Sequence, residues 1–207
     1  MSAVDVPGPA ERVAAQKTAL RDQLVTARRR RPLLELRSDA EAIAEHLLAA
    51  PEVRRAATVA AYVSVGSEPG TGPLLEALHR AGRRVVLPVL LADGDLDWAA
   101  WTGDLADLAS ARLGLLQPTG RRLGPAAIGT ADVVLVPGLA VDRSGMRLGR
   151  GGGSYDRALG RVPVGTFTCI VLHTGEIVDR VPADSHDRPV TAAVTPEGIT
   201  RFGRARP

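Results

Sequence analysis

Cysteine and aromatic residues are scarce in this sequence. One cysteine, Cys169, occurs among the 207 residues, and Phe, Trp and Tyr together make up 3% of them. A single cysteine excludes an internal disulfide, and its apolar surroundings in the sequence indicate a buried, unreactive thiol rather than a nucleophile. With so few aromatic rings, the hydrophobic core has to consist mainly of Val, Leu, Ile and Ala.

Long hydrophobic runs and targeting signals are also missing. No apolar stretch approaches the length needed to cross a bilayer. Residues 1–9 lack the basic and apolar pattern of a secretory signal. We therefore expect a cytoplasmic protein with no membrane partner.

Lysine is nearly absent, because all but one of the 26 basic residues are arginines and Lys17 is the exception. A coding bias towards arginine could leave one lysine by chance. Alternatively, position 17 needs a compact ammonium group that can contact a phosphate as a point charge. Arg21 lies four residues later on a predicted helix over residues 10–31, so the two cations share one helical face. Such a pair can hold a phosphate or simply be solvated, and the sequence leaves both open.

The charge and the motif content exclude several common classes. The net charge of +3 suits a small anionic ligand and does not require nucleic acid. The basic run of residues 28–31 has no interleaved aromatic or glycine residues, so a solvated helix end is favoured over an RNA-binding surface and no nucleic-acid partner is expected. The four histidines have no paired spacing for zinc, and neither a GxxxxGK[ST] loop nor a serine nucleophile elbow is present.

Predicted helices alternate with short apolar runs along the chain. We expect helices over residues 10–31, 39–50 (capped by Ser38), 71–81 (ending at Gly82) and 155–161. We expect strands over residues 57–65, 84–90, 96–101, 133–136, 167–172 and 192–195, with a surface excursion over 106–128. This alternation predicts one α/β domain over residues 1–207, with a central mostly parallel mixed sheet and helices on both faces in a Rossmann-like three-layer arrangement. Residues 1–9 and 203–207 are expected to be flexible.

The most informative segment is the glycine run, residues 147–157, with the sequence RLGRGGGSYDR. It follows an apolar run over residues 133–139 that is typical of a buried strand, and a helix-like stretch comes next. A strand that ends in a glycine-rich turn and opens a helix is a phosphate-binding geometry, because glycines let backbone amides approach an anion and the helix N-terminus is partly positive. The arginines add full charge and forked donors.

Three carboxylates outside the apolar runs are also suggestive. Glu68 follows the first predicted strand, and ligands of open α/β sheets bind beyond the carboxyl ends of strands. It could accept a hydrogen bond from a ligand amino group or be an ordinary loop carboxylate. Asp156 and Asp187 could share a magnesium ion, which commonly takes one or two carboxylates plus phosphates and water. Nothing in the sequence alone brings these two residues together.

Several motifs together resemble one known family. They are VPGLAVD at residues 136–142 with Gly145, the glycine run with its YDR ending, Lys17 with Leu20 and Arg21, YVS at 62–64 with Glu68 and Thr71, Gln117-Pro118, and Val181-Pro182 with His186-Asp187. Taken in their order along the chain, they are similar to the 5-formyltetrahydrofolate cyclo-ligase (methenyltetrahydrofolate synthetase) family. The resemblance extends from about residue 17 to residue 195.

The resemblance implies a single α/β domain, expected to be monomeric, that uses ATP and Mg²⁺ to convert 5-formyltetrahydrofolate to 5,10-methenyltetrahydrofolate with release of ADP and phosphate. By the same resemblance, catalysis falls to Lys17, Arg147, Arg150 and Tyr155. ATP is bound by Lys17, Arg21, Arg147, Leu148, Gly149, Arg150, Gly151, Gly152, Gly153, Ser154 and Tyr155. Folate is bound by Val63, Glu68, Arg150, Gly151, Gly152, Gly153 and Ser154. The metal is held by Asp156 and Asp187.

Ser154 departs from the pattern, because many members of this family have two consecutive tyrosines before the Asp, and here the pair is Ser154-Tyr155. Neutral drift in an aromatic-poor protein is one interpretation. A paralogue with another substrate, or a non-catalytic folate- or nucleotide-binding protein, is the alternative. The drift interpretation predicts that Ser154→Tyr leaves activity similar or improves the KM for folate.

Overall fold

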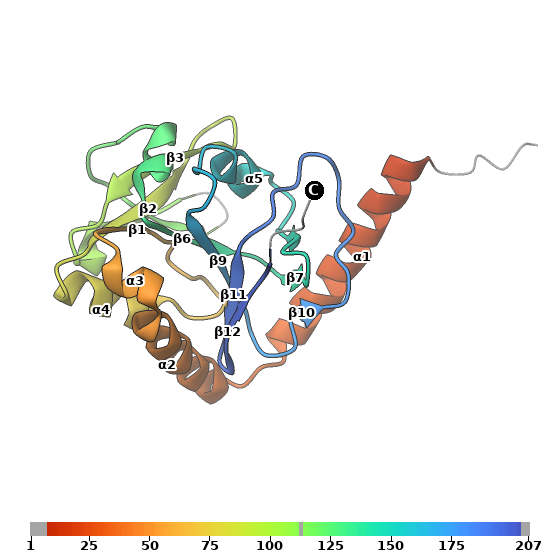
Figure 1. Cartoon of the computed structure of the whole chain (residues 1–207), viewed down its shortest axis with the longest axis horizontal. Coiled ribbons are helices and arrows are strands. Elements are labelled where there is room, and N and C mark those ends of the chain that lie inside the picture. Colours follow the sequence, from red (N-terminus) through yellow and green to blue (C-terminus); the bar gives the residue numbers. More distant parts are fainter. Residues whose placement is uncertain (1–7, 112–113, 204–207) are drawn as a thin grey trace, which may run out of the picture.

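The computed structural model describes residues 8–111 and 114–203. A seven-stranded sheet runs through the centre of the molecule (Figure 1). In spatial order its strands are β12 (Gly198–Arg201), β11 (Ala192–Thr195), β9 (Phe167–Val171), β6 (Val133–Pro137), β1 (Thr58–Ala60), β2 (Arg84–Leu90) and β3 (Leu96–Ala100). The five inner strands are parallel, and the two edge strands β12 and β3 pair antiparallel with their neighbours. The mostly parallel mixed sheet is therefore confirmed.

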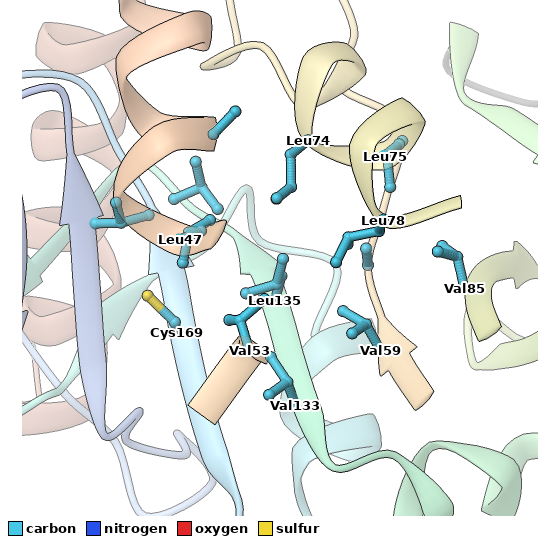
Figure 2. Close-up of a cluster of buried hydrophobic side chains, with 14 of the residues drawn as sticks. Leu47, Val53, Val59, Leu74, Leu75, Leu78, Val85, Val133, Leu135 and Cys169 are labelled. Carbon is cyan, nitrogen blue, oxygen red and sulfur yellow. The ribbon is translucent and has the colours of Figure 1, made fainter. Parts of the chain in front are cut away.

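One face of the sheet is covered by helices α2 (Leu33–Ala49), α3 (Pro51–Arg55) and α4 (Gly72–Arg80). Figure 2 shows the leucines of α4 and Leu47 of α2 above Val59, Leu135 and Cys169 of the sheet. Alternate residues of each strand point to this face, so a core of Val, Leu, Ile and Ala is buried with few aromatic rings, as expected.

The opposite face is covered by the short helix α5 (Ser154–Leu159) and a 3₁₀-helix, Pro125–Thr130. Trp98 of β3 and Ile170 of β9 are both fully buried there. Helices thus lie on both faces, as the three-layer prediction required.

A second, three-stranded sheet lies beside the central one and was not predicted from the sequence. It consists of β10 (Ile177–Val178), β7 (Ala140–Asp142) and β8 (Arg147–Leu148). Helix α1 (Pro9–Arg29) packs Leu20, Leu24 and Val25 against its core, and Figure 1 shows α1 beside β7 and β10, away from α2–α4. These strands are only two or three residues long, too short for a periodic pattern to reveal.

The structure corrects two predicted boundaries. Helix α2 begins at Leu33 rather than at Asp39, and Ser38 lies inside it with its hydroxyl donating to the Glu35 carbonyl. The extended backbone of Pro32 starts the helix, and the leucines of its first turn, Leu33 and Leu34, are exposed rather than part of the buried face of α2. The first strand covers only Thr58–Ala60 of the predicted 57–65, because the chain leaves the sheet and turns towards Glu68.

The remaining predictions concern the surface excursion, the two termini and the absence of a membrane-spanning helix. The excursion over 106–128 contains a two-stranded sheet of β4 (Leu108–Ser110) and β5 (Leu116–Pro118). Most of the termini expected to be flexible, residues 1–7 and 204–207, lie outside the described residues. Within the described part of the chain, no helix combines the length and apolarity that a bilayer span requires.

Candidate functional site

The strand order places a cavity where ligands of α/β proteins usually bind. From β1 the chain builds the sheet outward through β2 on one side and, after returning, through β6 and β9 on the other. Loops beyond the carboxyl ends of β1 and β6 therefore diverge and leave a crevice at this topological switch point. A cavity of about 60 Å³ lies there, and its lining includes Val63 and Glu68 after β1 and Pro137 at the end of β6.

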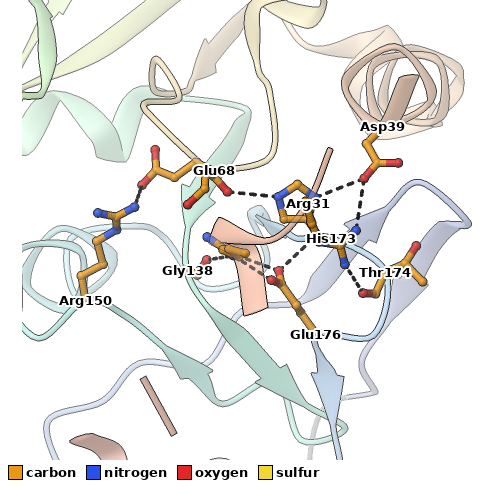
Figure 3. Close-up of polar contacts among 10 residues, drawn as sticks. Arg31, Asp39, Glu68, Gly138, Arg150, His173, Thr174 and Glu176 are labelled. Atoms are coloured by element: carbon orange, nitrogen blue, oxygen red, sulfur yellow. Dashed lines mark hydrogen bonds and ion pairs between the residues drawn. The ribbon is translucent and has the colours of Figure 1, made fainter. Parts of the chain in front are cut away.

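Glu68 is held firmly at this cavity. Its side chain is 8% exposed and Oε2 accepts a hydrogen bond of 2.9 Å from the Val65 backbone N–H. Oε1 faces the guanidinium of Arg150 at 3.1 Å, and the Arg150 side chain is 57% exposed. The pair joins the loop after β1 to the glycine run, so the two candidate segments that the sequence singled out lie side by side (Figure 3).

Two tyrosines line the same cavity with unpaired hydroxyl groups. The hydroxyls of Tyr62 and Tyr155 are buried and have no hydrogen-bond partner among the described residues. Burial raises the pKa of both phenols, and the negative charge of Glu68 raises them further. Buried hydroxyl groups normally find a partner, so these two are suited to polar atoms of a bound ligand.

The glycine run forms a loop between β8 and α5. Gly151 and Gly153 have φ values of 102° and 66°, in the left-handed region that a side chain disfavours. The strand directly before the loop is the two-residue β8 rather than the buried β6, because β7 and β8 intervene. This corrects the prediction that the apolar strand itself leads into the glycine turn.

Helix α1 places cations on the other side of this loop. Arg21 Nε donates to the Gly149 carbonyl at 2.9 Å, and its guanidinium lies along the position where a side chain at Gly151 would project. Lys17, one turn earlier, is 8% exposed and is therefore not the solvated cation of the simplest interpretation. The helix face that carries both cations is turned towards the site.

Lys17 is held between two carboxylates. Its Nζ donates to Asp184 at 2.8 Å and to Asp187 at 2.6 Å. Burial by itself lowers the pKa of Lys17, but the two hydrogen bonds and negative charges outweigh it and the pKa lies above its ordinary value. Burial by itself raises the pKa of Asp187. The hydrogen bonds from Lys17 and from the Asp184 backbone N–H outweigh it, so the pKa of Asp187 lies below its ordinary value. Sequence reasoning missed Asp184, whose only signal is its position three residues before Asp187.

Arg147 and Asp156 form the third part of the site. Arg147 is buried, and its guanidinium contacts the Asp156 carboxylate at 2.9 Å and lies 5.9 Å from the centre of the Tyr155 ring. Its Nε is buried without a partner in the described structure. The Arg188 backbone N–H donates to Asp156 at 3.3 Å, so the fold brings the segment after Asp187 to Asp156. Leu148 is buried beneath the run and supports it rather than facing outward.

Ser154 points to a different neighbour. Its hydroxyl donates to the carbonyl of Gly94, in the turn between β2 and β3, and Arg157 donates to the same oxygen at 2.6 Å. The serine therefore ties the beginning of α5 to this turn.

A buried polar cluster links these parts and corrects the expectation of a solvated helix end at Arg28, whereas Arg29 and Arg30 are exposed, as expected. Arg28 is 2% exposed and donates to both carboxylate oxygens of Glu176 at 2.7 Å and to the Gly138 carbonyl. Glu176 also accepts the backbone N–H of His173 (Figure 3). The basic run by itself does not indicate its anionic partner, Glu176, because that residue lies on a distant segment. His173 follows β9 at the same sheet edge as Glu68, a signal that was available in the sequence.

Comparison with known proteins shows the family of this chain. A model described as the 5-formyltetrahydrofolate cyclo-ligase family matches residues 13–196. A 5-formyltetrahydrofolate cyclo-ligase of Mycolicibacterium smegmatis is 41% identical over 186 residues, 87% of this chain and 94% of that protein. The protein of the same description from Escherichia coli K12 is 35% identical over 164 residues, 75% of this chain and 87% of that protein.

A solved structure extends the agreement to the fold. The NMR structure of Aquifex aeolicus 5,10-methenyltetrahydrofolate synthetase has a TM-score of 0.78 to this chain at 28% identity, covering 92% of this chain and 95% of that one. The family resemblance stated from the motifs is thereby confirmed. The chain belongs to the 5-formyltetrahydrofolate cyclo-ligase family, a family of ligases.

Proposed function

We propose that the protein catalyses the ATP- and Mg²⁺-dependent cyclisation of 5-formyltetrahydrofolate to 5,10-methenyltetrahydrofolate, with release of ADP and phosphate. The observation that carries the proposal is that the glycine run lies between the cations of α1 and the cavity at Glu68. Arg21 of α1 contacts it at Gly149, and Glu68 of the cavity contacts it at Arg150. A site for phosphates and a site for an uncharged ring with amino groups thus share one loop.

On the nucleotide side, Lys17, Arg21 and Arg147 supply the positive charge for the phosphates of ATP. The unpaired Nε of Arg147 is a buried donor that a phosphate oxygen would satisfy. The residues from Gly149 to Tyr155 surround the nucleotide, supported from beneath by the buried Leu148, with Gly151, Gly152 and Gly153 allowing close approach of the backbone. The guanidinium of Arg147 lies over the face of the Tyr155 ring, and this contact helps to hold Arg147 in place.

Asp156 and Asp187 are the residues that would hold a magnesium ion, and in the structure they pair instead with Arg147 at 2.9 Å and with Lys17 at 2.6 Å. In the described part of the chain no group of three or more His, Cys, Asp and Glu side chains has a metal-binding arrangement. Two carboxylates are nevertheless sufficient when phosphates and water complete the coordination. The ion would neutralise charge on the phosphoryl group being transferred.

On the folate side, Glu68 accepts hydrogen bonds from the amino-bearing pterin ring, and Val63 packs against it. The unpaired hydroxyls of Tyr62 and Tyr155 offer donors to the ring's polar atoms. Arg150 occupies the Glu68 oxygen that faces the cavity, at 3.1 Å, so it has to move aside for the ring to reach that oxygen. Its exposed side chain on a glycine-rich loop allows that movement. Ser154, which bonds to Gly94, contributes to this site by fixing the end of the loop.

The chemistry follows from the poor leaving ability of an amide-like formyl oxygen. That oxygen attacks the terminal phosphorus of ATP and ADP departs, so the formyl carbon then carries a phosphate. The neighbouring folate nitrogen attacks this carbon, loses its proton, and phosphate leaves as the ring closes. The protein's part is to position the two substrates and to stabilise negative charge, with Lys17, Arg147 and Arg150 around the transferred group.

The direct test is an activity assay on the purified protein with 5-formyltetrahydrofolate, ATP and Mg²⁺. We expect the near-ultraviolet absorbance of the methenyl product to appear, and to depend on both ATP and metal. A folded protein that gives no product beside an active control enzyme would refute the proposal. If that protein still binds folate or nucleotide, the non-catalytic binding protein is the correct alternative.

A further inference from the structure

We propose that His173 is a positioning residue that fixes the orientation of Glu68, and thereby sets the affinity for the folate substrate. The role in substrate affinity rests on the function proposed above, whereas the role in loop geometry does not. His173 follows strand β9 and is completely buried. Figure 3 shows its ring between Asp39 and the segment that carries Glu68.

The link runs through the peptide group that joins Ser67 to Glu68. Its carbonyl oxygen, on Ser67, lies 3.2 Å from Nε2 of His173. Its N–H, on Glu68, donates to the Val65 carbonyl at 3.2 Å. Because both polar atoms of this peptide group are bound, its plane cannot rotate without losing a hydrogen bond. The direction in which the Glu68 side chain leaves the backbone is fixed by that plane.

The chemistry of the contacts determines how His173 acts. A carbonyl oxygen can only accept a hydrogen bond, so Nε2 carries a hydrogen that it donates to Ser67. The other ring nitrogen, Nδ1, lies 3.2 Å from the Asp39 carboxylate of helix α2. The Asp39 carboxylate also only accepts, so this second contact is a hydrogen bond, and keeps the ring from turning away, when Nδ1 carries a hydrogen too. The backbone N–H of His173 is held separately by Glu176. The ring is therefore a rigid strut between α2 and the loop.

The consequence for Glu68 is preorganisation of its carboxylate. One oxygen is bound by the Val65 N–H and the other faces the cavity and Arg150. If the Ser67 carbonyl is released, the loop over residues 64–71 gains conformations in which this carboxylate no longer faces the cavity. Substrate binding would then have to order the loop, which weakens affinity without changing the reacting groups.

Two substitutions separate this role from a merely structural one. The amide nitrogen of Gln lies near the place of Nε2, and that of Asn near the place of Nδ1, so His173→Gln retains the donor to Ser67 and His173→Asn loses it. We expect His173→Asn to raise the KM for 5-formyltetrahydrofolate about tenfold, with kcat and the KM for ATP changed by less than about twofold. His173→Gln should stay within about twofold of the wild type on all three constants.

Hydrogen–deuterium exchange gives a readout that does not depend on catalysis. Peptides covering residues 64–71 should exchange faster in His173→Asn than in the wild type, and His173→Gln should not differ from the wild type. As a matched control, His46→Asn removes another ring-to-carbonyl contact, between Nε2 of His46 and Pro196 at 3.1 Å. It should leave the folate KM and exchange over 64–71 unchanged.

The outcomes distinguish the two proposals. If the wild type makes no methenyl product, the proposed function fails, and the exchange measurement still decides the role of His173. If the wild type is active but the Asn and Gln variants have equal folate KM values and equal exchange, the positioning role is wrong. If the KM values for folate and ATP both rise in both variants, and both variants lose thermal stability, His173 likewise contributes to general stability alone.

Discussion

Replacing Lys17 tests the central part of the proposed site most directly. Lys17→Met removes the ammonium group while keeping an unbranched apolar side chain, and Lys17→Arg keeps the charge but changes its shape. In the structure the Lys17 side chain is 10% exposed, and its Nζ contacts Asp184 at 2.8 Å and Asp187 at 2.6 Å. Both substitutions therefore act on stability as well as on activity, and the two effects have to be measured separately.

The stability effect can be worked from the two contacts. Each is a charge-assisted hydrogen bond, which contributes about 1.5–3 kcal/mol when it is buried. The Asp184 side chain is 43% exposed, so its contact is screened by solvent and contributes little. The Asp187 side chain is 17% exposed, and its contact keeps most of its strength. We expect Lys17→Met to lower the free energy of unfolding by about 2–3 kcal/mol at neutral pH, measured by urea denaturation.

The pH dependence of this loss has a definite sign. The pKa of Asp187 is lowered in the folded state, so its contribution is present above the ordinary value of 3.8 and is lost as the pH falls through the folded pKa. The pKa of Lys17 is raised, so its contribution is complete below 10.5 and is lost as the pH rises through the folded pKa. The difference between wild type and Lys17→Met should be constant near neutrality, shrink below pH 3.8 and shrink again above 10.5.

The effect on catalysis should exceed what the stability loss explains. Removing one group that stabilises transition-state charge lowers kcat by about a hundred- to a thousandfold. We expect that loss for Lys17→Met in the methenyl absorbance assay, at a temperature where the variant is fully folded. Arg201→Ala is a matched control, because it removes a cation from an ion pair with Glu52 remote from the site. A folded Lys17→Met protein with normal activity would refute the role of Lys17 at the phosphates. A Lys17→Arg protein with unchanged activity would show that arginine serves equally well at position 17, so that the single lysine of the sequence is a coincidence.

Three further predictions concern other parts of the molecule. Glu68→Gln should raise the KM for 5-formyltetrahydrofolate at least about tenfold and leave the KM for ATP unchanged, because it removes the charge at the cavity only; equal changes in both constants would contradict this. Arg28→Met should lower the free energy of unfolding by about 3–5 kcal/mol, because it leaves the buried Glu176 carboxylate without its partner; denaturation that matches the wild type would show that the pair is not stabilising. Cys169 is fully buried and burial raises the pKa of its thiol, so a thiol reagent at about pH 8 should react with it only after unfolding; rapid reaction of the folded protein would contradict this.

Most of the central sheet was predictable because each strand carries its own signal. The strand prediction over residues 84–90 coincides with β2, and those over 133–136 and 192–195 match β6 and β11 within a residue. A buried parallel strand is apolar on both faces, so its pattern does not depend on neighbours far along the chain. The beginning of α2 was not predicted, because Leu33 and Leu34 of its first turn are exposed and do not belong to the buried face of the helix, so that only Pro32 marks its start.

The candidate site could be predicted in part. Glu68 was singled out by its place after the first strand, and the structure puts it at the cavity beside Arg150. Arg28 was misjudged, because a run of arginines has the same appearance in the sequence whether its members face solvent or a buried carboxylate. The ligand roles of Asp156 and Asp187 remain predictions, although the structure does bring their segments together.

By itself, the sequence determined the class of fold, the apolar strands and the glycine run, since these depend on residues that are neighbours along the chain. Only the tertiary structure decided which distant residues meet: Lys17 with Asp187, Arg28 with Glu176, and His173 with the Ser67 carbonyl. Each of these contacts joins segments more than a hundred residues apart. Their partners are set by the order of the strands in the sheet and by the packing of α1 against the small sheet, which no local pattern records.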